Sequence, residues 1–104
     1  MRIFKTKTFA KWAVKQGINS ANLCQAMLEI DSGLVDANLG GYLIKKRVAI
    51  NGKGKSGGAR TLLAYQFTEQ AIFIYGFAKN ARSNITSHEL AALKHLANEL
   101  VNYS

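Results

Sequence analysis

The chain has 104 residues, the length of one ordinary domain, and 48% of them are apolar, so neither a wholly disordered chain nor a second core fits. Fourteen Lys and Arg against six Asp and Glu give a formal net charge of +8, typical of proteins that bind polyanions. No apolar run approaches the roughly 20 residues that a membrane-spanning helix needs, and residues 1–7 do not look like a secretory signal. We therefore expect one cytoplasmic domain over residues 1–104, with no membrane contact.

The first third of the chain predicts a short strand followed by two helices. We expect the strand at residues 2–5, and apolar residues recur at helical spacing over residues 8–16. A second helix begins near Asn19 or Ser20, both of which are favourable N-cap residues. Its apolar stripe comprises Leu23, Ala26, Met27 and Ile30.

The rest of the chain predicts three strands and a last helix. Residues 42–50 alternate as a strand does, with Ile44 and Lys46 on one face and Lys45 and Arg47 on the other. Residues 51–58 are rich in glycine, and we expect an irregular connection there. Two further strands are expected at residues 60–67 and 71–77. A capping box from Thr86 to Glu89 begins the C-terminal helix.

These elements follow the order β-α-α-β-β-β-α, which indicates the α+β class. Their connections are short, so we expect an antiparallel sheet in which neighbouring strands follow the chain. The helices are expected to pack together on one side of this sheet.

The basic residues are distributed unevenly. No acidic residue lies between Asp36 and Glu69, and a one-sign block of this kind indicates that an anion binds there. Six cations fall in the block: Lys45, Lys46, Arg47, Lys53, Lys55 and Arg60. Lys79 and Arg82 follow the last predicted strand. If the strands pair, several of these cations converge at one end of the sheet and form a phosphate-binding pocket.

The residues available for chemistry exclude several mechanisms. His88 and His95 lie on the predicted last helix, outside the basic block, and the single cysteine, Cys24, reads as a small buried residue. The carboxylates are scattered, so we expect no metal site and no cofactor. A hydrolytic triad has no support either. Cations alone can still cleave RNA, because RNA carries its own nucleophile in the 2′-hydroxyl, which a lysine can deprotonate while arginine holds the phosphate.

Three segments resemble the RelE/HigB toxins of bacterial type II toxin–antitoxin systems. They are GGYLIKKRVA at residues 40–49, GKGKSGGAR at residues 52–60 and IYGFAKN at residues 74–80. The resemblance runs from about residue 38 to 95, and the element order matches over the whole chain. It implies a RelE-like domain that cleaves mRNA, mostly in the ribosomal A site and without a metal, and so inhibits translation. It also implies a cognate antitoxin, with a helix-turn-helix fold, that silences the toxin.

The resemblance assigns roles to individual cations. Lys45 or Arg47 lies near the nucleophile, Arg60 binds the reacting phosphate, and Lys79 matches the lysine after the last core strand. Lys53 and Lys55 match the basic loop on the RNA backbone, and the charge pattern adds Lys46 and Arg82 as RNA-binding residues. The chain also departs from the family. Asn80 stands where some members have a second arginine, and Thr86 stands where some members have a general-acid tyrosine.

The identity of the general acid and of the base stays open at this point. Tyr65, Tyr75 and Tyr103 are candidates for the acid, although core packing is favoured for the first two. Two other functions remain alternatives: a basic RNA-binding module without catalysis, and a ParE-like DNA gyrase inhibitor of the same fold. The expected partners are the antitoxin, the ribosome and mRNA, with the toxin a monomer alone or a heteromer with its antitoxin.

Overall fold

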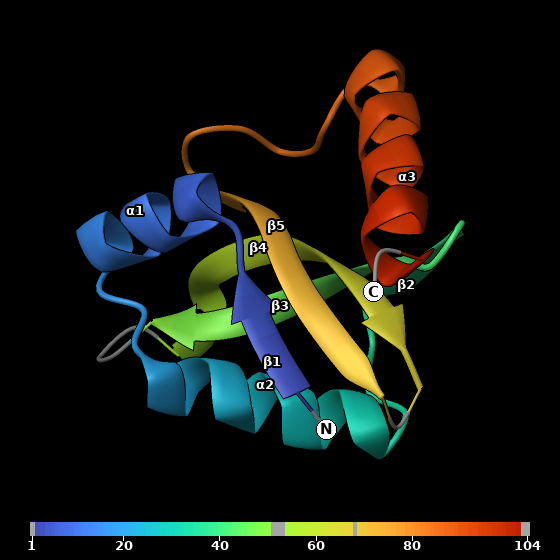
Figure 1. The fold of residues 1–104 in the computed structure, drawn as a ribbon. Coiled ribbons are helices and arrows are strands. Elements are labelled where there is room, and N and C mark those ends of the chain that lie inside the picture. Colours follow the sequence, from blue (N-terminus) through green and yellow to red (C-terminus); the bar gives the residue numbers. More distant parts are fainter. Residues whose placement is uncertain (1, 51–53, 68, 103–104) are drawn as a thin grey trace.

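The computed structural model describes residues 2–50, 54–67 and 69–102, with residues 54–57 described by their backbone alone. The elements follow the order β1 (Arg2–Lys5), α1 (Lys7–Gln16), α2 (Ser20–Asp31), β2 (Ala37–Gly40), β3 (Leu43–Ile50), β4 (Gly54–Gln66), β5 (Gln70–Ala78) and α3 (Ser87–Asn102). Figure 1 shows one sheet with the helices packed against it. The predicted α+β class is confirmed. No helix among the described residues is long and apolar enough to cross a membrane.

The strand order differs from the sequence expectation. The sheet has the order β1-β5-β4-β3-β2, and β1 pairs with β5 in parallel while the other pairs are antiparallel. β2 is an additional strand that the sequence analysis missed. It joins β3 through Gly41 and Tyr42, which both have positive φ as a two-residue type I′ turn requires. A tyrosine with positive φ is rare, so this turn was not apparent from the sequence.

The helices cover both faces of the sheet, not one side as expected. Neighbouring residues of β3 and β4 enter two separate apolar clusters, because successive side chains of a strand point to opposite faces. Ile44 and Leu63 pack with α1 and α2, whereas Leu43 and Leu62 pack with α3. Most of β5 is buried, as in a strand covered on both faces.

A β-bulge changes which side chains of β5 face each helix layer. Leu63 pairs with Phe73 but Leu62 pairs with Tyr75, so β5 has one extra residue, Ile74, at this point. Tyr75 and Phe77 consequently join the cluster beneath α3, and Gly76 faces α1 instead.

Two smaller expectations were also wrong. β4 begins at Gly54, inside the glycine-rich segment that was expected to be irregular, and Ile50 pairs with Gly54 across the sheet. Cys24 is exposed rather than buried, because it lies on the outer side of α2. Neither difference changes the predicted order of the helices along the chain.

Gly76 lies so close to Trp12 that a Cβ atom there would overlap the indole ring. We expect Gly76→Ala to lower the free energy of unfolding by about 1–3 kcal/mol through overpacking. Combining it with Trp12→Leu should cost less than the sum of the two single changes, since the smaller side chain removes the clash. Urea denaturation of the four proteins of this cycle measures the coupling. Full stability of Gly76→Ala would contradict the close packing.

Candidate functional site

β3 and β4 bring three of the predicted site residues onto one face of the sheet. Arg47 and Arg60 are direct cross-strand partners, and Lys45 is paired with Leu62, two residues from Arg60 on the same face. Leu62 packs beneath α3, so this is the face that α3 covers in part. Lys45, Arg47 and Arg60 remain partly exposed there, which leaves them open to a ligand. We call these three residues the cation triad.

The cation triad is electrostatically unfavourable by itself. Like charges directly opposite each other destabilise a sheet, and Arg47 opposes Arg60. Asp36 offsets this in part, with its carboxylate 3.6 Å from Nε of Arg47. Nη1 of Arg60 is buried and has no hydrogen-bond partner among the described residues. An unsatisfied charged donor beside a second guanidinium is a site that an anion stabilises.

Lys46 lies on the opposite face of β3, away from the cation triad. Its side chain is only 4% exposed, and its Nζ lies 2.8 Å from a carboxylate oxygen of Glu29 on α2. The same ammonium donates a hydrogen bond to the carbonyl of Leu34. The structure therefore gives Lys46 a role in joining α2 to β3 and does not bring it to the other predicted RNA-binding residues.

Apart from Arg82, three predicted cations remain: Lys79, Lys55 and Lys53. Lys79 is exposed and directly follows Ala78, which pairs with Ala59 beside Arg60. Lys55 lies on β4 by its backbone, and Lys53 falls outside the described residues. Lys79 thus lies at the end of β5, next to the residue pair that adjoins Arg60.

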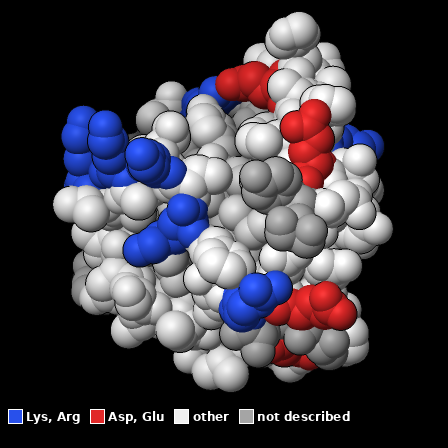
Figure 2. Space-filling model, viewed as in Figure 1, with Lys and Arg blue, Asp and Glu red and all other residues white. Residues whose placement is uncertain are grey.

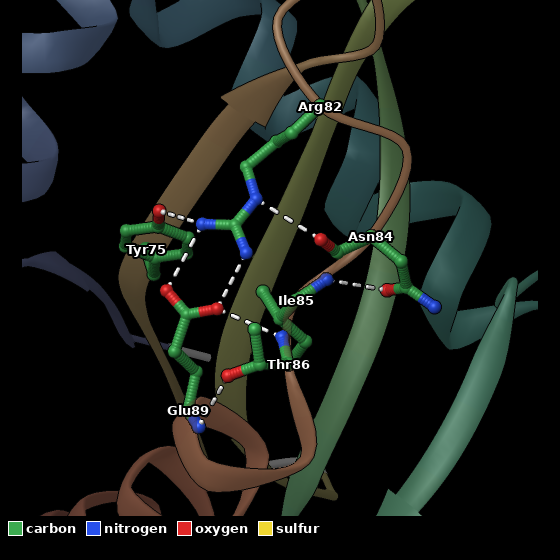
Figure 3. Close-up of polar contacts among 6 residues, drawn as sticks. All are labelled: Tyr75, Arg82, Asn84, Ile85, Thr86 and Glu89. Atoms are coloured by element: carbon green, nitrogen blue, oxygen red, sulfur yellow. Dashed lines mark hydrogen bonds and ion pairs between the residues drawn. The ribbon is translucent and has the colours of Figure 1, made fainter.

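Arg82 is held within a network of side chains at the start of α3 (Figure 3). Its guanidinium forms two hydrogen bonds with the Glu89 carboxylate, one of them from Nη1 to Oε2 at 2.9 Å. Nη1 also donates to the Tyr75 hydroxyl at 3.1 Å, and Nε donates to the carbonyl of Asn84. The guanidinium further lies over the Phe77 ring, 5.8 Å from its centroid. Arg82 therefore joins β5, the segment at residues 79–86 and α3.

Glu89 has two functions at the N-terminus of α3. It completes the predicted capping box, because its carboxylate accepts from the Thr86 amide and its own amide donates to the Thr86 hydroxyl. Hydrogen bonds from Arg82, and next from the Thr86 backbone, lower the pKa of Glu89 from 4.5 to about 2. The same ion pair raises the pKa of Arg82. Both groups are consequently charged throughout the physiological range.

Tyr75 packs against the apolar cluster beneath α3, as the sequence analysis favoured, and its hydroxyl also accepts a hydrogen bond from Arg82. The bulge at Ile74 places it in the cluster beneath α3, whereas unbroken alternation from Phe73 would point it at α1. Its ring lies 6.3 Å from the Phe77 ring, and Phe77 pairs with Arg60. No pattern in the sequence locates a bulge at this position, since β5 is apolar almost throughout.

A second basic surface lies on α1, outside the predicted site. Lys7, Lys11 and Lys15 are exposed and recur at four-residue spacing, which places them along one side of the helix. Figure 2 shows basic side chains gathered over α1 at the upper left. This surface adds to the positive potential that attracts polyanions to the molecule.

Comparison with known proteins adds a family relationship to this geometry. A family model described as the RelE toxin of the RelE / RelB toxin-antitoxin system matches residues 1–104, the whole length of the chain. No curated protein compared with the chain matches it.

Lys45 and Lys46 provide a matched pair of stability variants on one strand. We expect Lys46→Ala to lower the free energy of unfolding by about 3 kcal/mol, because it removes a cation that faces the mostly buried Glu29 carboxylate. Lys45→Ala, on the partly exposed face, should cost only about 0.5 kcal/mol. Chemical denaturation distinguishes the two, and equal losses would contradict the different roles.

The Arg82–Glu89 pair predicts a pH dependence of stability. Its carboxylate has a lower pKa in the folded chain, so the unfolded chain binds more protons between about pH 4.5 and pH 2. The contribution of Glu89 is therefore complete above pH 4.5 and is lost as the pH falls toward 2. Glu89→Gln should flatten the dependence of the melting temperature on pH in this window. An unchanged slope would contradict the depressed pKa.

Proposed function

The chain belongs to the RelE toxin family and so is a toxin that pairs with an antitoxin, and we propose that it cleaves mRNA on the ribosome. The proposed reaction is a metal-independent attack of the RNA 2′-hydroxyl on the adjacent phosphate. Translation stops because messages are cut, so the toxin acts in the cytoplasm.

The observation that carries the proposal is the pairing of Arg47 with Arg60. The two guanidinium groups belong to register partners on one face, with Lys45 nearby and Nη1 of Arg60 lacking a partner among the described residues. Negative charge grows on the phosphate oxygens as the 2′-oxygen attacks, and fixed cations stabilise that charge without rearranging. Arginine is suited to this task because its planar guanidinium binds two phosphate oxygens at once.

We propose the following division of roles. Arg60 binds the non-bridging oxygens of the scissile phosphate, and Lys45 or Arg47 lies near the attacking 2′-hydroxyl. Lys79 contacts the same phosphate group from the end of β5. Lys53 and Lys55 bind the RNA backbone beside the cut. A DNA strand lacks the 2′-hydroxyl and is therefore no substrate for this chemistry.

The antitoxin is proposed to silence the toxin by covering these cations. An acidic or amphipathic segment would offset the repulsion between Arg47 and Arg60 and would exclude RNA from the same face. We expect this antitoxin to have a helix-turn-helix fold.

The proposal predicts that induced expression without antitoxin arrests growth, and that Arg60→Ala prevents the arrest. Loss of one fixed charge at the reacting phosphate should slow cleavage by about 10²–10³-fold. Mapping mRNA 5′ ends within minutes of induction should reveal new in-frame ends confined to translated messages. The Arg60→Ala strain should lack these ends.

Arg2→Ala is the matched control, because it removes one exposed arginine from β1, at the far edge of the sheet. It should remain toxic and should cleave the same sites. Growth arrest with intact mRNA would contradict cleavage and would favour a gyrase or other target, as would full toxicity of a Lys53/Lys55/Arg60 triple variant. RNA binding without arrest would leave a non-catalytic binding module.

A further inference from the structure

Cleavage by a 2′-hydroxyl leaves a negative charge on the departing 5′-oxygen. An alkoxide is a poor leaving group in water, so a positioned proton donor accelerates this step by about 10²–10⁴-fold. The cation triad stabilises the phosphate but offers no neutral hydroxyl. A donor must therefore come from another residue on the same face.

The bulge in β5 brings one hydroxyl to that face. Tyr75 pairs with Leu62, which also pairs with Lys45, and Arg60 lies two residues from Leu62 on the same side. Arg60 is thus the diagonal cross-strand neighbour of Tyr75, and diagonal neighbours are within reach of aromatic and long side chains. The Tyr75 side chain is only partly buried, and it lies on the same face of the sheet as the cation triad.

The hydrogen bond from Arg82 fixes the orientation of this hydroxyl. Nη1 of Arg82 donates to the Tyr75 oxygen at 3.1 Å, so that oxygen acts as an acceptor and its own hydrogen points elsewhere. No described residue accepts a hydrogen bond from Tyr75. The phenol thus retains a proton that it can donate to a ligand.

Arg82 is itself immobilised by the contacts visible in Figure 3. Its guanidinium is held by the Glu89 carboxylate and by the carbonyl of Asn84. Since the pKa of Glu89 is about 2, the ion pair persists at every pH at which the ribosome works. Arg82 therefore offers Tyr75 a constant and rigid partner rather than a free RNA-binding charge.

We propose that Tyr75 is the proton donor to the leaving 5′-oxygen and that Arg82 is its positioning residue; this rests on the cleavage activity proposed above. The 2′-oxygen forms a bond to phosphorus as its proton passes to water, and the bond from phosphorus to the 5′-oxygen breaks. The Tyr75 proton moves to that 5′-oxygen, and Arg82 stabilises the phenolate that remains. The products are a 2′,3′-cyclic phosphate and a 5′-hydroxyl end, and water returns the proton to Tyr75.

The other tyrosines in the described part of the chain do not fit this role. The Tyr65 hydroxyl donates to Asp31 at 2.9 Å, on the face that α1 and α2 cover. Burial, and next this hydrogen bond, raise the pKa of Tyr65 to about 12. Tyr42 lies in the turn between β2 and β3. Tyr103 falls outside the described residues.

A substrate with sulfur in place of the leaving 5′-oxygen tests the assignment. A thiolate departs without a proton donor, because the pKa of a thiol is only about 8.5. The experiment first maps a cleavage site with the wild-type toxin on programmed ribosomes. It then compares single-turnover rates on messages with oxygen or sulfur at that linkage.

We expect Tyr75→Phe to cleave the oxygen message about 10²-fold or more slowly than wild type and the sulfur message at nearly the wild-type rate. Arg82→Gln should show the same selective rescue, whereas Arg60→Ala should be slow on both messages. Tyr65→Phe is the matched control, since it removes a tyrosine hydroxyl from the opposite face, and it should match wild type on both.

Two results would overturn the assignment. Wild-type cleavage of the oxygen message by Tyr75→Phe would exclude a role as proton donor. Equal losses on the two messages would mean that Tyr75 supports the fold alone, and thermal melting of the variant would confirm this. If the wild-type toxin cleaved neither message, the proposed function itself would fail. That outcome is distinct from failure of this inference alone, in which the wild-type toxin cleaves both messages and Tyr75→Phe shows no selective loss on the oxygen message.

Discussion

The buried ion pair between Lys46 and Glu29 determines which charges reach the candidate site. The side-chain period of a strand is two, so a slip of β3 by one residue would exchange its two faces. Lys46 prevents this because its ammonium is held by Glu29 and by the Leu34 carbonyl beneath α2. The Thr61 hydroxyl donates to the Lys46 carbonyl and ties the same residue to β4. With Lys46 fixed inward, its neighbours Lys45 and Arg47 must face the other way.

The β-bulge at Ile74 performs the corresponding task for β5. It turns Tyr75 and Phe77 toward the face of Arg60, and it leaves Gly76 where only a glycine fits against Trp12. Bulges occur preferentially beside functional sites, where they redirect a side chain. The register of β3 and the bulge of β5 thus act together, since one supplies the charges and the other supplies the hydroxyl beside them.

Residue patterns predicted much of this arrangement. The predictions failed where the outcome depends on contacts between segments that are distant in the sequence. Alternation over residues 42–50 predicted the two faces of β3, and the capping box predicted the start of α3; the structure confirms both. The bulge and the positive φ of Tyr42 depend on tertiary packing, which overrides local preference. The partners of Lys46 and Arg82 were equally invisible, because charge counts do not reveal which carboxylate lies opposite a cation.

Pairing divides the excess positive charge of the chain into two kinds. Lys46 and Arg82 satisfy acidic partners inside the molecule, and they hold the sheet and α3 in position. Arg47 and Arg60 oppose each other, Asp36 offsets the charge of Arg47 only in part, and one guanidinium nitrogen of Arg60 is left unsatisfied among the described residues. The rigid core therefore maintains a repulsion that an anion relieves. An RNA phosphate and an acidic antitoxin segment would relieve the same repulsion. Both would bind the same two guanidinium groups, so they could not bind this face together.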